Sequence, residues 1–263
     1  MSEPLLYRVE DGLARITLNR PQRLNAFNAD LAHAWAEATA AAVRDSAVGA
    51  ILIEGEGRAF CAGGDVIDMA TGMGGSADIQ RLADVIHSGI ASLVSSSVPV
   101  VAAAHGTTAG GGLGILLASD YAVVGSDSRR GSLYANIGLT PDLSVSAQLA
   151  AAVGERRALQ LLLTDRMLTA AEAVEWGIAA EAVGEGDAAA IAAAVRARAE
   201  EIARFWLAGA FGAYGQAKRL VRSRPERTFA GQLDEEARSI AAAFDGAEAQ
   251  GLIAAFASRS AAR

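Results

Sequence analysis

The stretch Val98–Asp120, with the sequence VPVVAAAHGTTAGGGLGILLASD, decides the fold of this chain. It begins with the small and β-branched apolar run Val98–Ala104, which predicts a buried strand. It ends with the compact run Leu113–Ala118, whose leucine and alanine content indicates a buried helix. Three consecutive glycines at positions 110–112 separate the two runs. A strand, a glycine turn and a helix therefore form the expected centre of the fold.

The triple glycine has two explanations. Glycine loses more backbone entropy on folding than any other residue, so three in a row indicate a specific requirement. One requirement is close packing of the helix against the strand. The other is chemical, because amides at a helix N-terminus lack intrahelical acceptors and the helix dipole adds positive potential there. Such amides bind anions or stabilise an oxyanion that forms during a reaction, and the glycines alone favour neither explanation.

The composition argues against several classes of protein. The chain has 263 residues, 52% of them hydrophobic, which suits one large domain or a domain with an appendage. A formal net charge of −7 argues against a nucleic-acid surface. Cys61 is the single cysteine, so no intrachain disulfide forms and we expect a reducing compartment. Because signal-peptide and membrane-length apolar patterns are absent, we expect a cytoplasmic protein without membrane contact.

Strand and helix patterns alternate up to Ala182, which indicates an α/β class. Alternating apolar runs on either side of an Asp-Gly pair predict a hairpin of Leu5–Val9 and Leu13–Leu18. Asn28 is placed to cap the helix that follows. Further strands are expected at 50–53 and 121–124. From Asp187 onward the composition predicts only helices.

Two later segments carry specific local expectations. Met69–Asp78 is rich in glycine, serine and alanine, so we expect a mobile loop there. The run Thr140-Pro141-Asp142 predicts the start of a helix that reaches Val153, with Thr140 as its N-cap and proline in the first turn.

Common nucleotide-binding and hydrolase motifs are absent from the sequence. No GxxxxGK[ST] or GxSxG pattern occurs, and the glycines lack the GxGxxG spacing of dinucleotide sites. His33, His87 and His105 are well separated from one another and from Cys61, so we expect no metal site.

Three segments, taken in order, resemble the crotonase superfamily, which is the enoyl-CoA hydratase/isomerase family. They are ITLNRPQRLNA at 16–26, GRAFCAGGD at 57–65 and HGTTAGGGLG at 105–114. The likeness continues through GLTPD at 138–142 into the C-terminal part, so it covers essentially the whole chain. Each motif is modest alone, but the ordered set is specific.

The resemblance implies a fold, a substrate and an assembly. The expected fold is α/β, a crotonase-like spiral of ββα repeats, with a core over residues 1–200 and a C-terminal helical region over 201–263 that serves trimerisation. The expected partner is an acyl-CoA thioester substrate, so CoA is part of the substrate and no separate cofactor is expected. The expected assembly is a homotrimer or a dimer of trimers, with no nucleic acid and no membrane.

Carried over residue by residue, the resemblance also assigns a site. In the family, two backbone amides hold the thioester oxygen as it becomes an enolate, and they fall on Ala62 and Gly111. Lys218 and Phe256 match positions that reach the CoA of a neighbouring subunit. Arg23 would meet CoA phosphates through charge-assisted bonds, its alternative being a solvated turn arginine. The family's CoA contacts as a set fall on Arg23, Leu24, Ala26, Gly64, Asp65, Val66 and Ile67.

The sequence departs from the hydratases of the family at both catalytic positions. Those enzymes use two glutamates as acid and base on a water, and the matching residues here are Gly114 and Tyr134. Adding water needs one group that takes its proton and one that protonates the α-carbon. With both carboxylates missing, we do not expect efficient hydration by the usual mechanism.

Asp142, directly after Pro141, is the carboxylate that remains. In isomerase-like members an aspartate in this context moves a proton between the α- and γ-carbons, and one carboxylate suffices for that task. The resemblance therefore implies an enoyl-CoA isomerase with Asp142 as the proton shuttle. A structural alternative is helix capping, because the dipole favours an aspartate in a first turn by roughly 0.3–1 kcal/mol.

Three other functions stay open. In 4-chlorobenzoyl-CoA dehalogenase the matching aspartate is a nucleophile on an aryl ring and a histidine at the position of His87 activates water. Tyr134 and Ile86, however, stand where that enzyme has tryptophans, and His87 has an alternative as an ordinary helix histidine near a subunit or loop contact. The remaining two are an enoyl-CoA hydratase-type lyase and an acyl-CoA-binding protein with little catalysis. The acyl pocket is expected to depend on Met69–His87.

Overall fold

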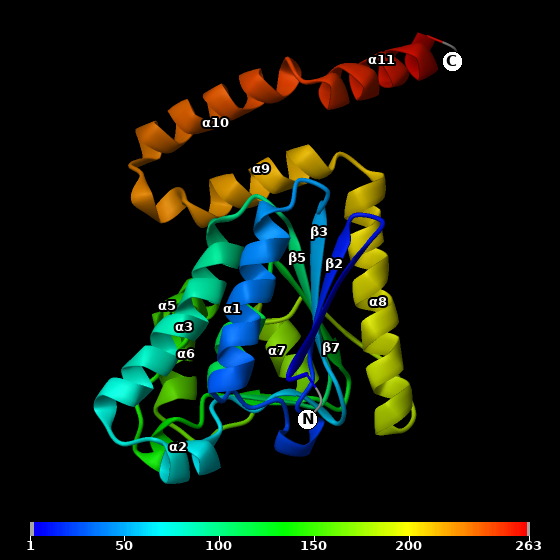
Figure 1. Ribbon diagram of the computed structural model, residues 1–263. Helices are drawn as coiled ribbons and strands as arrows, with labels where there is room; N and C mark the ends of the chain where they lie inside the picture. The colour runs from blue at the N-terminus through cyan, green and yellow to red at the C-terminus, as the bar shows by residue number, and fades with distance from the viewer. Residues whose placement is uncertain (1–2, 262–263) are drawn as a thin grey trace.

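The larger of two sheets in the computed structural model, which describes residues 3–261, has six strands in the order β1-β2-β3-β5-β7-β9 (Figure 1). β1 and β2 form an antiparallel hairpin, and every later neighbour is parallel. Parallel neighbours need crossover connections, and helices supply most of them. The strands are β1 Leu5–Glu10, β2 Leu13–Leu18, β3 Ala50–Gly55, β5 Val100–Ala104, β7 Tyr121–Gly125 and β9 Glu181–Val183.

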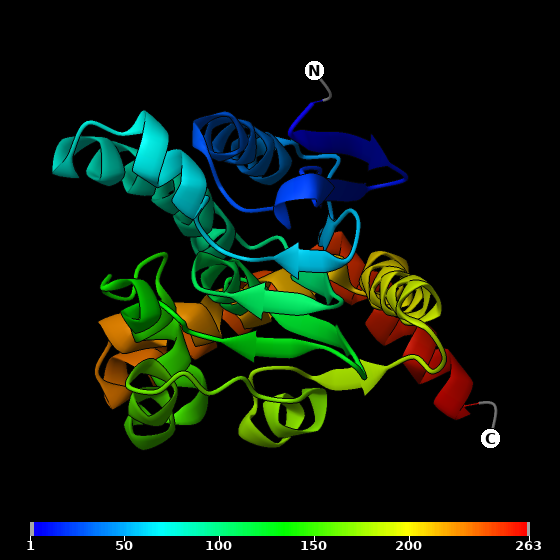
Figure 2. The same ribbon diagram turned by 90° about the horizontal axis from the view of Figure 1, so that it is seen from below.

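A smaller sheet in the order β4-β6-β8 lies at one end of the larger sheet and is seen from below in Figure 2. Its strands are β4 Ala59–Cys61, β6 Thr107–Ala109 and β8 Arg129–Gly131, paired in parallel. Each of them follows directly after a strand of the larger sheet, and a helical segment follows in turn. This order confirms the predicted spiral of ββα repeats and the α/β class.

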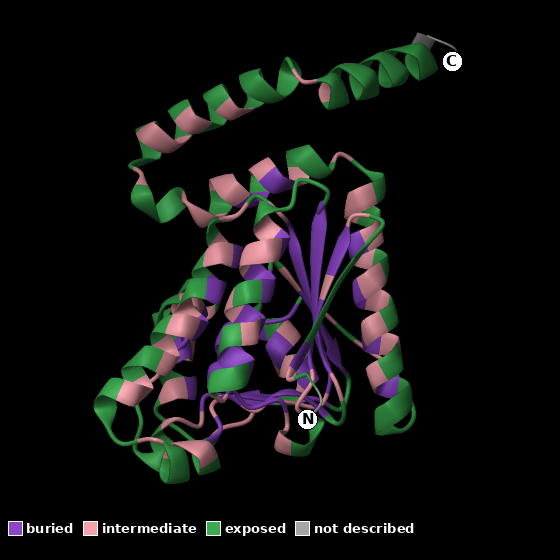
Figure 3. Ribbon diagram, in the orientation of Figure 1, coloured by how far each residue is buried: buried purple, intermediate pink, exposed green. Residues whose placement is uncertain are grey.

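Buried residues form a core on each face of the larger sheet (Figure 3). On one face, α1 (Ala29–Arg44) and α3 (Ser76–Ser95) pack over residues such as Ile51. On the other face, α8 (Ala188–Ala208) packs over residues such as Leu52. Because helices cover both faces, the central strands β3 and β5 are buried at every position. Their sequences are therefore continuous apolar runs and do not alternate between apolar and polar residues.

The C-terminal helices leave this core progressively. The predicted boundary after residue 200 falls inside α8, and Ala203 beyond it belongs to the same buried cluster as Val195. In Figure 1, α9 lies across one end of the sheet, whereas α10 and α11 extend away from it. No helix within residues 3–261 has the length and apolar character needed to span a bilayer. The remaining helices are α2 Val66–Gly72, α4 Gly111–Leu117, α5 Val145–Val153, α6 Glu155–Leu162, α7 Ala170–Trp176, α9 Phe211–Arg222, α10 Phe229–Phe244 and α11 Ala247–Ala261.

Most local predictions in the first half of the chain are confirmed. Asp11 and Gly12 form the turn between β1 and β2, both with positive φ, 49° and 79°. Asn28 caps α1, and its side chain accepts a hydrogen bond from the amide of Leu31 at 3.1 Å. The expected strand at 98–104 is β5, and the expected buried helix after the glycines is α4.

The predicted mobile loop at Met69–Asp78 is wrong. α2 extends through Gly72 and α3 begins at Ser76, so only residues 73–75 connect the two helices. The glycines and serine of this segment lie where helices end and begin, and such positions favour the same residue types as loops do.

The predicted helix start at Thr140 is also wrong. α5 begins at Val145, and residues 140–142 precede it without helical structure. Leu143 and Ser144 have positive φ, 52° and 65°, a conformation in which a right-handed helix cannot continue. Asp142 is therefore not in the first turn of a helix, which removes the capping explanation for this residue.

Ser144→Gly is expected to stabilise the protein. Glycine adopts a φ near +65° without the Cβ clash of serine, so the free energy of unfolding should rise by about 1 kcal/mol. This corresponds to a Tm increase of about 2–4 °C, measurable by thermal unfolding. Ser146→Gly is the matched control, because position 146 lies inside α5, where glycine should lower stability by about 0.5–1 kcal/mol. A lower Tm for Ser144→Gly would contradict the argument.

Candidate active site

Two of the three central glycines have different roles. A Cβ at Gly112 would lie 2.1 Å from the carbonyl oxygen of Cys61, so close packing of α4 on β4 requires this glycine. Gly111 is the first residue of α4, and within residues 3–261 its amide has no hydrogen-bond acceptor. Close packing therefore explains Gly112, while Gly111 presents an amide at a helix N-terminus.

The structure contradicts the assignment of Ala62 as an oxyanion donor. The amide of Ala62 donates to the carbonyl oxygen of Leu24 at 3.0 Å, so its hydrogen is already bonded inside the protein. Leu24 and Asn25 both have positive φ, 52° and 56°, and this turn brings the Leu24 carbonyl to the end of β4. A ligand would have to break this contact before it could use the Ala62 amide.

A different amide in the same loop, that of Gly64, is available. Phe27 donates to the carbonyl of Gly63 at 2.7 Å and accepts from the amide of Asp65 at 2.9 Å, so Gly64 is bridged to Phe27. In an extended segment successive backbone groups point in opposite directions, so the Gly64 amide points away from Phe27. A Cβ at Gly63 would lie 2.9 Å from the amide nitrogen of Gly111. The amides of Gly64 and Gly111, for which residues 3–261 provide no hydrogen-bond acceptor, thus lie on adjacent segments.

His87 and Asp142 form a polar pair at the site. Nε2 of His87 lies 2.7 Å from Oδ1 of Asp142. His87 belongs to α3, whereas Asp142 lies on the segment before α5, so the fold brings them together over a separation of 55 residues. Their side chains are 44% and 41% exposed and remain open to a ligand. His87 is therefore a neighbour of the candidate catalytic carboxylate and not an isolated helix histidine.

Tyr134 connects this pair to the glycines. Its hydroxyl donates to the backbone carbonyl of Asp142 at 3.1 Å. A Cβ at Gly111 would lie 3.5 Å from the same hydroxyl oxygen. Burial and, after it, the charge of Asp142 raise the pKa of Tyr134 far above its usual value, so the hydroxyl stays protonated. Gly111, Tyr134 and Asp142 consequently belong to one site.

Backbone packing closes the position of the first hydratase glutamate. A Cβ at Gly114 would lie 2.0 Å from the carbonyl oxygen of Leu143. No side chain fits at position 114 unless the segment that carries Asp142 moves. The second glutamate position holds Tyr134, whose hydroxyl is bonded to Asp142. A close backbone contact and a hydroxyl donor therefore take the place of the two carboxylates.

An open cavity of about 360 Å³ borders this site. It does not involve the expected residues before His87, because it lies along the part of α3 that begins at His87. Its mostly apolar wall suits an acyl group, in keeping with the usual character of small-molecule pockets. The lining residues are His87, Ile90, Ala91, Val94, Ser144 and Gln148.

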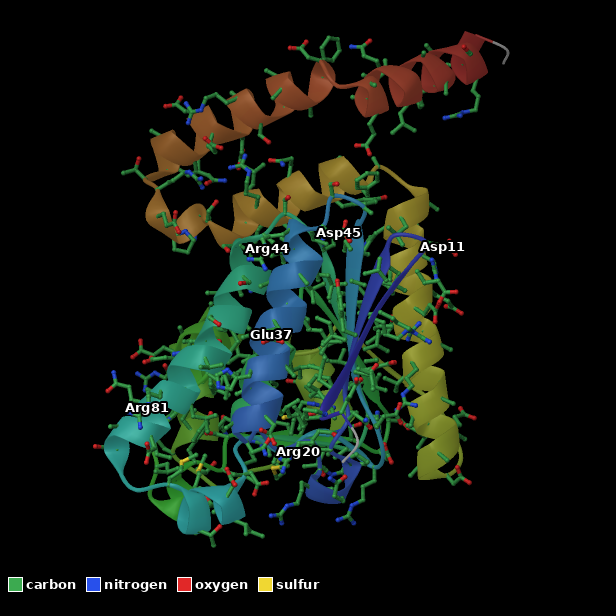
Figure 4. The ribbon with its side chains drawn as sticks, viewed as in Figure 1. Asp11, Arg20, Glu37, Arg44, Asp45 and Arg81 are labelled. Carbon is green, nitrogen blue, oxygen red and sulfur yellow. The ribbon has the colours of Figure 1, made fainter. Side chains whose placement is uncertain are left out.

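The fold brings the two predicted CoA-contact segments, 23–26 and 62–67, side by side around Asp65. Nη2 of Arg20 and Nε of Arg23 lie 3.0 and 3.5 Å from Oδ2 of Asp65, and Figure 4 labels Arg20 near the foot of α1. Asp65 also caps α2 by accepting a hydrogen bond from the amide of Asp68 at 3.2 Å. Burial opposes ionisation of Asp65, but these hydrogen bonds and the arginine charges outweigh it and lower its pKa. Asp65 therefore organises this loop.

The predicted CoA-contact residues of segments 23–26 and 62–67 differ in how accessible they are to a ligand. Val66 and Ile67, in the first turn of α2, are 47% and 57% exposed. Ala26 is buried, and its carbonyl accepts a hydrogen bond from Arg20. The exposed pair, together with the half-buried Arg23, is the part of the set that a nucleotide could contact.

Lys218 is not available to the CoA of a neighbouring subunit, which corrects the expectation from the sequence. Its ammonium donates to the carbonyls of Leu93 at 2.8 Å and Val98 at 2.7 Å and lies 2.9 Å from Oδ2 of Asp120. These partners use all three protons of an ammonium, and the side chain is 4% exposed. Phe256, by contrast, is largely exposed on α11, away from the core (Figure 1).

Comparison with known proteins identifies the family. The sequence profile described as Enoyl-CoA hydratase/isomerase matches residues 8–262. The chain therefore belongs to the enoyl-CoA hydratase/isomerase family, the crotonase superfamily of acyl-CoA-processing enzymes. The resemblance seen in the sequence is thereby confirmed.

Relatives within this family carry different activities. The chain is 35% identical to 4-chlorobenzoyl coenzyme A dehalogenase-2 of Arthrobacter sp over 236 residues, which cover 88% of this chain and 82% of that protein. It is 30% identical to 1,2-epoxyphenylacetyl-CoA isomerase of Escherichia coli (strain K12) over 241 residues, 90% and 88% of the two chains. The crystal structure of an enoyl-CoA hydratase from Mycobacterium smegmatis matches with a TM-score of 0.89 and 25% identity, covering 98% and 97%. The particular reaction has to be argued from the site.

Proposed function

We propose that the protein is an enoyl-CoA isomerase in which Asp142 carries the proton. The observation that supports this most is the replacement of both hydratase glutamates beside a retained aspartate. A Cβ at position 114 would lie 2.0 Å from the carbonyl oxygen of Leu143, and position 134 is a tyrosine whose hydroxyl donates to the backbone carbonyl of Asp142. One carboxylate suffices to move a proton between two carbons, whereas adding water needs two groups.

In this proposal each residue has a defined task. The carboxylate of Asp142 removes a proton from one carbon of the enoyl group and returns it to the other, so the double bond shifts. Meanwhile the thioester oxygen becomes an enolate oxygen, held by the amides of Gly64 and Gly111 with the dipole of α4. His87, 2.7 Å from one carboxylate oxygen of Asp142, orients the carboxylate and leaves its second oxygen for the substrate.

Incubation with a panel of enoyl-CoA thioesters in D₂O, followed by mass spectrometry, tests the proposal. We expect deuterium uptake and migration of the double bond without addition of water. A mass gain of one water would instead identify a hydratase-type lyase. Binding of thioesters without any turnover would identify an acyl-CoA-binding protein, and either result would contradict the isomerase.

A second candidate is an aryl-CoA hydrolase that uses Asp142 as a nucleophile. The contact between His87 and Asp142 favours it, because a histidine beside an aspartyl ester could activate the water that hydrolyses it. The relative named 4-chlorobenzoyl coenzyme A dehalogenase-2 gives a substrate class to test. In this reaction Asp142 displaces the halide from the ring, and water then attacks the acyl carbon of the resulting aryl ester.

A single turnover of 4-chlorobenzoyl-CoA in H₂¹⁸O distinguishes this candidate. The nucleophilic route leaves an unlabelled oxygen on the first product and ¹⁸O in the carboxylate of Asp142, which peptide mass spectrometry detects. If His87 activates the water, His87→Gln should let the aryl ester on Asp142 accumulate. An Asp142 peptide of unchanged mass in both proteins would exclude the nucleophilic route.

We also propose that the chain assembles as a homotrimer or a dimer of trimers through its C-terminal helices. α10 and α11 leave the core and expose large apolar side chains, which in soluble proteins mark interaction surfaces. Phe256 lies on α11 and is expected to reach a neighbour's CoA. Sedimentation equilibrium should give a mass three or six times that of the chain, and a monomer would contradict the proposal. The exposed apolar residues are Phe229, Leu233, Ile240, Phe244, Leu252, Ile253 and Phe256.

A further inference from the structure

Arg130, the middle residue of β8, is a buried cation for which the described residues supply no partner. Its side chain is among the largest fully buried ones in the protein, with 0% of the residue exposed. Within residues 3–261, its Nε, Nη1 and Nη2 atoms have no hydrogen-bond partner, and no carboxylate lies within 4.0 Å of them. The proposed isomerase mechanism does not use this residue. A buried charge in this state normally requires a counter-charge.

Two further unpartnered groups lie on the same face of the small sheet. Thr108 of β6 is directly opposite Arg130 in the parallel register of β6 and β8. Ser132 lies just beyond the end of β8, two residues after Arg130, and the alternation of side chains along the strand directs it toward the same face. The hydroxyl oxygens of Thr108 and Ser132 are both buried without a hydrogen-bond partner in the described chain. The opposite face is occupied, because a Cβ at Gly131 would lie 2.5 Å from the sulfur of Met167.

The guanidinium keeps its charge in this position. Burial and, after it, the neighbouring Arg129 lower the pKa of Arg130 to about 10. At neutral pH the group is therefore still a cation, and the charge of Arg129 repels it. Together, Arg130 offers five N–H donors, and Thr108 and Ser132 offer two hydroxyls that can also donate. Such a donor-rich, positively charged environment matches an anion and not a cation or an apolar group.

We propose that Arg130, Thr108 and Ser132 bind a small monovalent anion of the halide class, such as chloride. The three residues are buried to within 1% of full burial, which leaves no opening for a phosphate-bearing or organic ligand. A water molecule would satisfy individual donors, but it would leave the positive charge uncompensated. The site also adjoins the glycine turn at positions 110–112, because the amide of Gly110 donates to the carbonyl of Gly131 at 3.1 Å.

Thermal unfolding of the full protein in different salts tests the proposal. After exhaustive dialysis into sodium gluconate, addition of chloride or bromide at constant ionic strength should raise Tm saturably, by about 5 °C at concentrations well above Kd. Gluconate is too large for the buried site and serves as the reference anion. Crystals grown in bromide should show an anomalous peak within hydrogen-bond distance of the Arg130 guanidinium.

Substitutions localise the effect. Arg130→Met should abolish the halide dependence of Tm, whereas Arg129→Met, on the exposed neighbour, should keep it. If Arg130→Met does not fold, Thr108→Val with Ser132→Ala should raise the halide concentration needed for half the effect at least several-fold. The same Tm in all three salts, or an Arg130 surrounded by water alone in the bromide crystal, would overturn the proposal. So would loss of the halide effect in Arg129→Met.

Discussion

Asp142→Asn is expected to lower kcat for double-bond migration by about 10²–10⁴-fold, the usual contribution of a positioned acid–base group. Asparagine has nearly the same shape, and its side-chain oxygen can still accept a hydrogen bond from Nε2 of His87, 2.7 Å from the native carboxylate. The backbone carbonyl at position 142 keeps its bond from Tyr134. The substitution thus removes proton transfer while leaving the geometry in place, so KM should change little.

Three measurements separate this result from a structural effect. Deuterium exchange into a bound enoyl-CoA should slow in parallel with kcat, because both need the carboxylate. Tm should stay within about 1 °C of the native value, since surface substitutions away from packing are usually nearly neutral. Asp84→Asn, an exposed position one turn before His87 on α3, is the matched control and should retain full activity. Full turnover of Asp142→Asn on every active substrate would refute the shuttle role.

The parts of the fold that the sequence predicts well are those with strong local signals. β5 is a continuous apolar run because it is buried on both faces, and α4 contains Gly112, which packs closely against Cys61. The Asp-Gly turn and the Asn28 cap depend only on neighbouring residues. Each of these signals acts within a few residues, so no knowledge of the tertiary structure is needed.

The errors arise where distant segments decide the outcome. The Leu24 carbonyl accepts the hydrogen bond of the Ala62 amide. Only the bridge between Phe27 and Gly64 shows which amide of the 62–65 loop points toward the site. The run Gly63-Gly64-Asp65 before α2 indicates a loop that can offer backbone amides to a ligand. It does not indicate which of these amides points toward the site. Likewise, proline after threonine predicts a helix start, yet Leu143 adopts positive φ because the segment packs against α4.

Lys218→Met is expected to destabilise the protein by about 3 kcal/mol, near the low end for breaking a buried ion pair. The substitution removes the ammonium from Asp120 at 2.9 Å and removes one hydrogen bond each from the carbonyls of Leu93 and Val98. The Ser96 hydroxyl still donates to the Leu93 carbonyl at 3.0 Å. Asp120 keeps an ion pair with Arg222 at 3.0 Å, which limits the loss. For a chain of this size the Tm should fall by about 6–12 °C.

The same variant decides between the structural role of Lys218 and the role in CoA binding expected from the sequence. If Lys218 holds α9 against α3 and against the segments before β5 and β7, as its three contacts indicate, the folded variant should bind acyl-CoA with an unchanged KM at a temperature well below its Tm. If Lys218 contacts CoA, KM should rise while Tm changes little. Arg224→Met, which removes an exposed cation from the segment after α9, controls for net charge and should alter neither value. Because one outcome moves only Tm and the other only KM, a single purified variant distinguishes them.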